Sequence, residues 1–393
     1  MPTVNPEILI WARETAGLSI EDAANKLGLS GPNRLEALEA GDRDPSRRQL
    51  ANMSEKYRRP LLTFYLPNSP RESDKGQDFR TLPEALPIDS EALLSALLRD
   101  VHVRQGLIRA ALEEASEDEP LPFVGSAQME DGVTALVDEM NRVLNFSKDD
   151  FRAPNGQVNA PSINEGFKSL RAAVEKIGVF VLLMGNLGTH HTDIDVKFFR
   201  GFALADNIAP FIIINEKDSK AAWAFTLLHE LAHIWLGQTG ISGYDGEEDI
   251  ERFCDAVAAK FLLDPEELAE IEARQEKNLE ALIERIGGFA TAKNLSRKMV
   301  AYNLLSNGHI EWDVYRRLSA AFDEDRIAQQ RDRPRGDSGP DYYVVRRHRV
   351  GPGLVGTVRR MVAERVLSTT KAARVLGVKP TAVHRLVNIG RAA

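Results

Sequence analysis

Residues 223–235 read Trp-Ala-Phe-Thr-Leu-Leu-His-Glu-Leu-Ala-His-Ile-Trp, an apolar run that carries His-Glu-Leu-Ala-His at positions 229–233. On a helix, two histidines four positions apart lie on the same face, so both imidazoles can bind one metal ion. The glutamate between them can hold and deprotonate a metal-bound water. This stretch therefore predicts a helix that presents His229 and His233 to zinc and Glu230 to a water molecule.

A third protein ligand is expected downstream, because a catalytic zinc has three protein ligands and one open position. Residues 247–263 read as a second helix with apolar residues at helical spacing. On its other face, Glu251 can complete the metal site, and Asp255 can accept the free ring N–H of a ligand histidine. Glu247 and Glu248 compete for the ligand role. Glu251 is favoured, because it has an acidic partner four positions later.

These parts predict peptide hydrolysis. Zinc lowers the pKa of its water from about 15.7 towards 7, so that Glu230 can take a proton during attack on a carbonyl and pass it to the leaving amine. An oxyanion stabiliser is also needed. Tyr302, His309 and Tyr315 are candidates, and the sequence does not choose among them.

Residues 198–204 and 209–215 predict two strands joined by a short turn. A strand edge beside a zinc-binding helix can pair with an extended peptide. A plain core hairpin is the alternative interpretation, and both can hold together.

The stretch from Phe198 to about Tyr315 resembles the ImmA/IrrE family of zinc peptidases. The matching segments are Phe199-Arg-Gly-Phe202, Phe225 to His233, Glu251-Arg-Phe-Cys-Asp255 through Phe261-Leu-Leu263, and Leu295-Ser-Arg with Leu304 to Gly308. The resemblance implies a small α+β zincin-like domain with one zinc ion per chain. His229, His233 and Glu251 would be its ligands and Glu230 its general base, in a gluzincin-like arrangement.

The same resemblance implies cleavage of a transcriptional repressor, often an Xre-like one, after a stress or DNA-damage signal.

Two positions depart from the family pattern. Family members often carry Asn where this chain has Asp255, and often a proline one place before Pro265.

Residues 5–66 have the pattern of five short helices. Asn5 is expected to cap the first, Gly28 to end the second, and Pro45-Ser46 to open the fourth. This segment is similar to Xre-type helix-turn-helix domains. The resemblance places the third helix in the major groove of DNA. The residues expected near bases are Ser30, Asn33 and Arg34, and those expected near phosphates are Arg43, Arg47 and Arg48.

The charge of this segment weakens the DNA-binding interpretation. Residues 1–66 contain nine acidic and nine basic side chains, and Glu36 and Glu39 lie on the expected recognition helix. A DNA-binding domain usually has a basic face. The alternative is a helical domain that docks on another protein.

The carboxy-terminal segment differs in composition. Residues 341–393 carry a net charge of +9, whereas the whole chain carries −8. Residues 367–386 are similar to a second helix-turn-helix, with a glycine turn and a second helix opened by Pro380. This basic tail can bind nucleic acid through phosphates or dock on the acidic remainder of the chain, and the sequence leaves both open.

The whole chain is expected to be mostly α-helical, and its 393 residues allow two to three domains. The expected division is 1–67 as the Xre-like domain, 68–160 as linker and helical connector, 161–320 as the zinc peptidase domain, and 321–393 as linker and basic module. The single cysteine, Cys254, excludes an internal disulfide, indicates a reducing compartment, and is interpreted as a buried apolar residue.

No signal-peptide pattern opens the chain, and no apolar run approaches the roughly 18 residues that span a bilayer. A cytoplasmic regulator is therefore expected. Two hypotheses follow. The first is a zinc endopeptidase that cleaves a repressor, or itself, and so switches gene expression. The second is a DNA-binding transcription factor whose zinc site is only a sensor or scaffold, with no use for Glu230 as a base.

Overall fold

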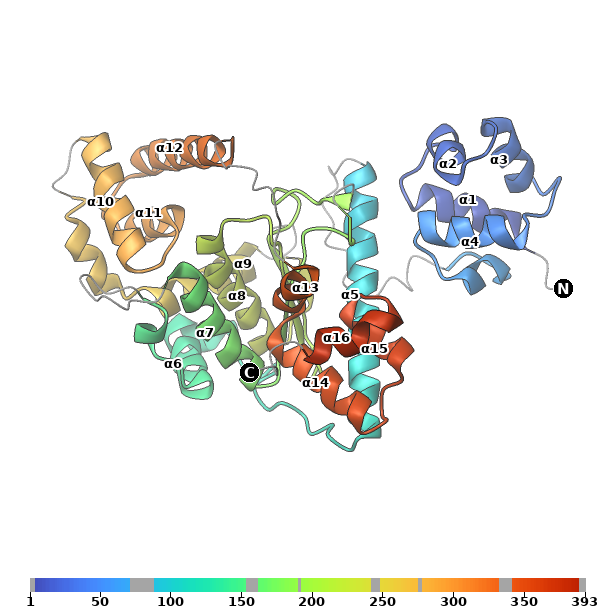
Figure 1. Ribbon diagram of the computed structural model, residues 1–393. Helices are drawn as coiled ribbons and strands as arrows, with labels where there is room; N and C mark the ends of the chain where they lie inside the picture. Colours follow the sequence, from blue (N-terminus) through green and yellow to red (C-terminus); the bar gives the residue numbers. More distant parts are fainter. Residues whose placement is uncertain are drawn as a thin grey trace. The chain divides into compact units, whose positions relative to one another are not determined.

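The computed structural model describes residues 4–70, 88–152, 162–189, 192–241, 248–274, 278–331 and 341–388. It divides into two compact units (Figure 1). The first unit comprises Met1–His102 and Asn186–Ile194, and the second comprises Val103–Gly185 and Asp195–Ala393. Helix α5 (Ile88–Glu114) contributes to both. Among the helices described, none combines the length and the apolar character needed to cross a membrane.

Between residues 4 and 70, the first unit consists of five short helical segments, which are α1 (Pro6–Glu14), α2 (Ile20–Leu27), α3 (Pro32–Glu39), α4 (Arg47–Lys56) and the 3-10 helix η1 (Leu61–Tyr65). The expected helix boundaries are confirmed. The side chain of Asn5 accepts a hydrogen bond from Glu7 N–H, and Gly28 ends α2 with φ of +67°. Ser46 and Gln49 form a capping box at the start of α4.

An ion pair within this unit involves one of the two acidic residues expected on the third helix. Glu39 is 7% exposed, and its carboxylate accepts hydrogen bonds of 2.8 and 3.1 Å from Arg13. Its negative charge is therefore neutralised in the interior instead of lying on the exposed face of α3. Glu36 remains exposed on that helix. The sequence could not show this pairing, because the two residues are far apart in the chain.

The second unit contains a mixed sheet of four strands, β1 (Phe180–Leu183), β2 (Gly201–Leu204), β3 (Phe211–Ile214) and β4 (Gly240–Ile241), in the order β1-β3-β2-β4. Strand β1 runs parallel to β3, whereas β2 is antiparallel to both β3 and β4. The predicted hairpin is β2–β3. Strand β3 lies between β1 and β2, and β2 pairs with β3 and, at Phe202 and Ala203, with β4, so the outer strands of the described sheet are β1 and β4.

The remaining helices of this unit surround the sheet or extend from it. They are α6 (Gly132–Leu144), α7 (Ile163–Lys176), α8 (Lys220–Trp235), α9 (Glu248–Leu262), α10 (Leu279–Ala292), α11 (Arg297–Ser306), α12 (Trp312–Arg331), α13 (Tyr342–Val350), α14 (Pro352–Ala363), α15 (Thr369–Leu376) and α16 (Val383–Asn388). Short 3-10 helices occur at η4 (Met129–Asp131), η5 (Lys148–Asp150), η7 (Pro265–Ile271) and η8 (Pro380–Ala382). Helix α12 reaches Arg331, so the first part of the linker expected from residue 321 is helical.

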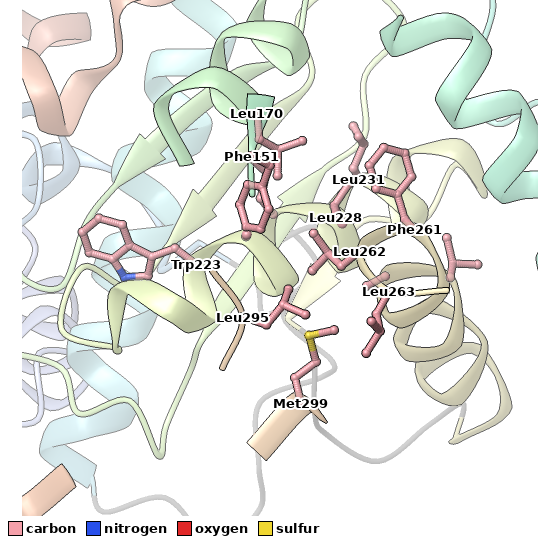
Figure 2. Close-up of a cluster of buried hydrophobic side chains, with 14 of the residues drawn as sticks. Phe151, Leu170, Trp223, Leu228, Leu231, Phe261, Leu262, Leu263, Leu295 and Met299 are labelled. Atoms are coloured by element: carbon pink, nitrogen blue, oxygen red, sulfur yellow. The ribbon is translucent and has the colours of Figure 1, made fainter. Parts of the chain in front are cut away.

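The core of this unit lies around α8. Helix α8 packs against α7, α9, β2 and β3, and a helix enclosed in this way is apolar on nearly all faces. Figure 2 shows Leu228 and Leu231 of α8 beside Phe261 of α9, with Leu170 of α7 and with Leu295, which lies between α10 and α11. Close packing on every side fixes the rotation of α8 about its axis, and this rotation decides where its two histidines point.

Candidate metal centre

Helix α8 supplies three polar side chains that are buried in an otherwise apolar setting. His229, Glu230 and His233 are 6%, 1% and 8% exposed. Burying a charged or polar group is costly unless it has partners. Their position in the core therefore points to a built site and not to surface residues of a helix.

Helix α9 brings the third member of the group. Glu251 Oε2 lies 3.3 Å from His229 Nε2, and Glu251 Oε1 lies 3.2 Å from His233 Nε2. The two Nε2 atoms are 3.1 Å apart. One donor atom from each of the three residues lies within 4.8 Å of the others, an arrangement that can hold a metal ion.

Asp255, one turn after Glu251 on α9, contacts the other side of the first histidine. Its Oδ1 lies 2.9 Å from His229 Nδ1. A carboxylate at that nitrogen favours the tautomer with the proton on Nδ1, which leaves Nε2 free to bind a metal. The structure therefore brings Asp255 into hydrogen-bonding distance of His229.

The electrostatics of the group favour a cation. Burial alone would lower the pKa of His229, but hydrogen bonds with Asp255 and Glu251 and the charge of Glu230 outweigh it and raise that pKa to about 10. Burial would likewise raise the pKa of Glu251, yet its hydrogen bonds with the two histidines lower it to about 2. Three carboxylates around two imidazoles thus stabilise positive charge at this point, which fits a divalent metal ion.

The approach of β2 to Glu230 is a feature that the sequence did not single out. A Cβ atom at Gly201 would lie 2.8 Å from Glu230 Oε1 and 2.5 Å from Thr226 Cγ2. Only glycine leaves room for both side chains there. The available signal was a glycine at the start of an apolar strand, which often marks a close approach of another group.

The candidates for an oxyanion stabiliser lie on α11, on α12 and in the turn between them. Tyr302 and Tyr315 are half-buried, with ring centroids 6.1 Å apart. Burial raises the pKa of Tyr315, and the nearby Tyr302, Arg200 and Asp255 also act on it.

His309 lies in the turn that follows α11, where its backbone N–H donates to Leu304 O. This contact places His309 at the end of α11, whereas the ring of Tyr315 contacts those of Tyr302 and Trp312.

The remaining residues that the sequence analysis named are the cysteine, the two competing glutamates and the residues expected at DNA. Cys254 is fully buried, and burial together with the nearby carboxylates raises the pKa of its thiol, in keeping with an apolar role. Glu247 and the side chain of Glu248 lie outside the described residues. The six residues expected at DNA are all exposed in the first unit, namely Ser30, Asn33, Arg34, Arg43, Arg47 and Arg48.

Residues 176–305 match the family model of the IrrE N-terminal-like domain, Peptidase_M78. The match includes α8, α9 and the whole candidate metal centre, and it supports the resemblance to the ImmA/IrrE family over this part of the chain. It also supports a metallopeptidase role for the same part. Comparison with curated proteins and with solved structures gave no match.

Proposed function

We propose that the chain is an intracellular zinc endopeptidase that hydrolyses a peptide bond in a repressor-type protein, or in itself, to switch gene expression in a stress response. The observation that carries this proposal is the group of His229, His233 and Glu251, with Glu230 buried beside it. A scaffold site needs the ligands alone. A further carboxylate buried next to the ligands is costly, and a general base that accepts and donates a proton is a reason for it.

The donor set favours zinc among the common metals. Two imidazole nitrogens and one carboxylate are the ligands of many catalytic zinc sites, whereas calcium and magnesium prefer oxygen ligands throughout. When bound at such a site, zinc acts as a Lewis acid and lowers the pKa of a coordinated water towards about 7. In this arrangement His229 Nε2, His233 Nε2 and the Glu251 carboxylate would hold the ion, and Asp255 would fix the tautomer of His229.

Glu230 is the proposed general base. Its carboxylate accepts a proton from the attacking water and delivers it to the nitrogen of the leaving amine, so that the same side chain serves both halves of the reaction. Glycine at position 201 leaves room for that carboxylate, because a Cβ atom there would come within 2.8 Å of Glu230 Oε1. The oxyanion stabiliser is proposed to be one of Tyr302, His309 and Tyr315, which lie on α11, in the turn after it and on α12.

The first unit is proposed to bring the enzyme to its target. Residues 1–67 would form an Xre-like helix-turn-helix domain that binds DNA through its exposed arginines or docks on a repressor of similar fold. The internal pairing of Glu39 with Arg13 removes one acidic charge from the exposed face of α3 and supports DNA binding. Residues 68–160 would connect this domain to the peptidase domain at 161–320.

The alternative is a DNA-binding regulator whose zinc site is a sensor without proteolysis. The test uses wild-type protein and Glu230→Gln, with zinc measured per chain in both. Each is incubated with Xre-type proteins encoded beside its gene, with and without single-stranded DNA, and fragments are read by mass spectrometry. The proposal expects about one zinc per chain in both proteins and fragments only from the wild type. Equal cleavage by Glu230→Gln would contradict it, and zinc without cleavage under every condition would favour the sensor.

A further inference from the structure

The carboxy-terminal helices α13–α16 form a small module with its own apolar centre. Helix α14 packs against both α15 and α16, which also contact each other. The buried residues at their interface include Ala372, Ala373 and Leu376 on α15 and Val383 and Leu386 on α16. Alanines at the crossing allow the two short helices to approach closely.

The connection between α15 and α16 has the geometry of a helix-turn-helix. Helix α15 ends at Gly377, whose φ of +61° is the left-handed conformation that favours glycine. Its N–H donates to Ala373 O and Arg374 O. After two further residues, Pro380 opens η8, which continues directly into α16. A sharp turn of this kind holds the second helix across the first, as DNA-binding helix-turn-helix units do.

Two arginines hold the turn, one from α5 and one from α13 of the module itself. Arg104 of α5 donates to Val375 O at 3.0 Å, and Arg346 of α13 donates to Leu376 O at 2.9 and 2.7 Å. Both acceptors are carbonyls at the C-terminal end of α15, where positive charge is favourable. These two basic residues therefore stabilise the module.

Two other arginines hold the module to the body of the unit. Arg349 pairs with Glu216 at 2.5 Å, and Arg360 pairs with Glu117. The pairs account for part of the positive charge of the segment. A different set of basic side chains is exposed on α14, α15 and the turns beside them, namely Arg359, Arg365, Lys371, Arg374 and Lys379.

The exposed face of the second helix carries side chains suited to reading bases. Thr381, His384, Arg385 and Asn388 are exposed and follow one another at helical spacing along η8 and α16. All four can donate or accept hydrogen bonds at base edges. The guanidinium carbon of Arg385 lies 4.1 Å from the centre of the Tyr343 ring, and its Nη2 lies 3.3 Å from Asp341 Oδ2, so α13 and its N-cap residue hold this side chain.

We infer that α14–α16 bind duplex DNA, with η8 and α16 in the major groove and Lys371, Arg374 and Lys379 near phosphates. The turn geometry, the polar face and the exposed cations support this inference together. It is independent of the proposed peptidase activity, because none of these residues belongs to the metal centre. It also differs from the DNA contact proposed for the first unit.

The test measures fluorescence anisotropy of a labelled 20-base-pair duplex of mixed sequence with the full chain, across a range of salt concentrations. The variant is Lys371→Gln/Lys379→Gln, and the matched control is Lys168→Gln/Lys176→Gln, two exposed lysines of α7. Each pair is also placed in an Arg47→Gln/Arg48→Gln background, which separates any contribution of the first unit.

The inference expects wild type and control to bind alike. The module variant should bind about tenfold more weakly near 0.1 M salt, with a salt slope smaller by about 1 for each lysine. If Lys371→Gln/Lys379→Gln bound the duplex as tightly as the wild type, the inference would be overturned. Loss of all binding in the Arg47→Gln/Arg48→Gln protein, with the module intact, would overturn it as well. Equal affinity for a single strand of the same length would overturn the assignment to duplex DNA.

Discussion

The α-carbon of Gly201 lies against the carboxylate of Glu230, so closely that a Cβ atom there would come within 2.8 Å of Glu230 Oε1. Strand β2 thus limits the positions open to the proposed general base. Glu230 is 1% exposed, and the surrounding core leaves little space into which it could move. The absence of a side chain at position 201 therefore leaves space for a side chain of a separate element.

Gly201→Ala tests this contact. The added methyl group should displace the Glu230 or Thr226 side chain and lower peptidase activity by about tenfold or more, while zinc binding remains, because a displacement near 1 Å can cost about 100-fold in rate. Activity and zinc content are measured together. Gly288→Ala on α10 is the control, because its Cβ would meet no atom within 4 Å. Equal activity of the two variants would show that the contact has no catalytic role.

Glu251→Gln should remove the third metal ligand. The amide carries no negative charge, so the affinity for zinc should fall at least as much as the roughly 10- to 100-fold seen when a supporting carboxylate is lost. Equilibrium competition with a chromogenic chelator gives the affinity. Glu248→Gln is the matched control on the same helix. If Glu248→Gln instead lost the metal, the assignment of the third ligand would be wrong.

Asp255→Asn should weaken the metal site without abolishing it. Asn retains an oxygen that can accept from His229 Nδ1, but it lacks the charge that increases the basicity of the ring. A fall of about 10-fold in zinc affinity is expected, with Asp255→Ala falling further. The same chelator competition ranks the three proteins. If Asp255→Ala bound zinc more tightly than Asp255→Asn, a hydrogen-bonding role for Asp255 would be ruled out.

The pair Arg171–Glu175 should be important for attaching the carboxy-terminal module. Their side chains are 4% and 5% exposed, with Nε 3.1 Å from Oε1. Arg171 also donates to His348 O, and Glu175 accepts from Gly353 N–H at 2.8 Å. Glu175→Ala leaves a buried guanidinium without its counter-charge and should lower the free energy of unfolding by about 3 to 5 kcal/mol.

Denaturant unfolding measures that change. Arg171→Met/Glu175→Leu is the companion variant, because replacing both charges leaves no isolated ion and should cost less than Glu175→Ala alone. A double variant that is less stable than the single one would contradict this account of the pair.

Glu267 should make the free energy of unfolding depend on pH in the acidic range. Burial would raise its pKa, but hydrogen bonds from Arg152 and Lys293 lower it to about 2, below the value of 4.5 for the free side chain. A depressed carboxyl pKa stabilises the fold fully above about pH 4.5, and this stabilisation is lost as pH falls towards 2. Glu267→Gln should therefore cost about 1 to 2 kcal/mol at pH 7 and progressively less below pH 4. A pH-independent difference between the two proteins would argue against the ion pairs.

Local sequence patterns were sufficient for the elements of the metal centre. The spacing of His229 and His233, and of Glu251 and Asp255, follows from the helical repeat, so each pair could be placed on one helix face without a structure. The pairing of the two helices could also be expected, since a zinc site needs a third ligand. The caps at Asn5 and Gly28 were equally local, because capping depends on the residues next to the helix end.

Contacts between distant residues were decided only by the tertiary structure. The closeness of Gly201 to Glu230, the burial of Glu39 against Arg13 and the attachment of the last helices through Arg171 all join residues that are far apart in the chain. Nothing in a one-dimensional pattern encodes which helix face meets which strand, because that choice depends on the packing of the whole core. The sequence thus determined which types of residue are available for the chemistry. The fold determined how these residues are oriented, which charges they are paired with and how closely they are enclosed.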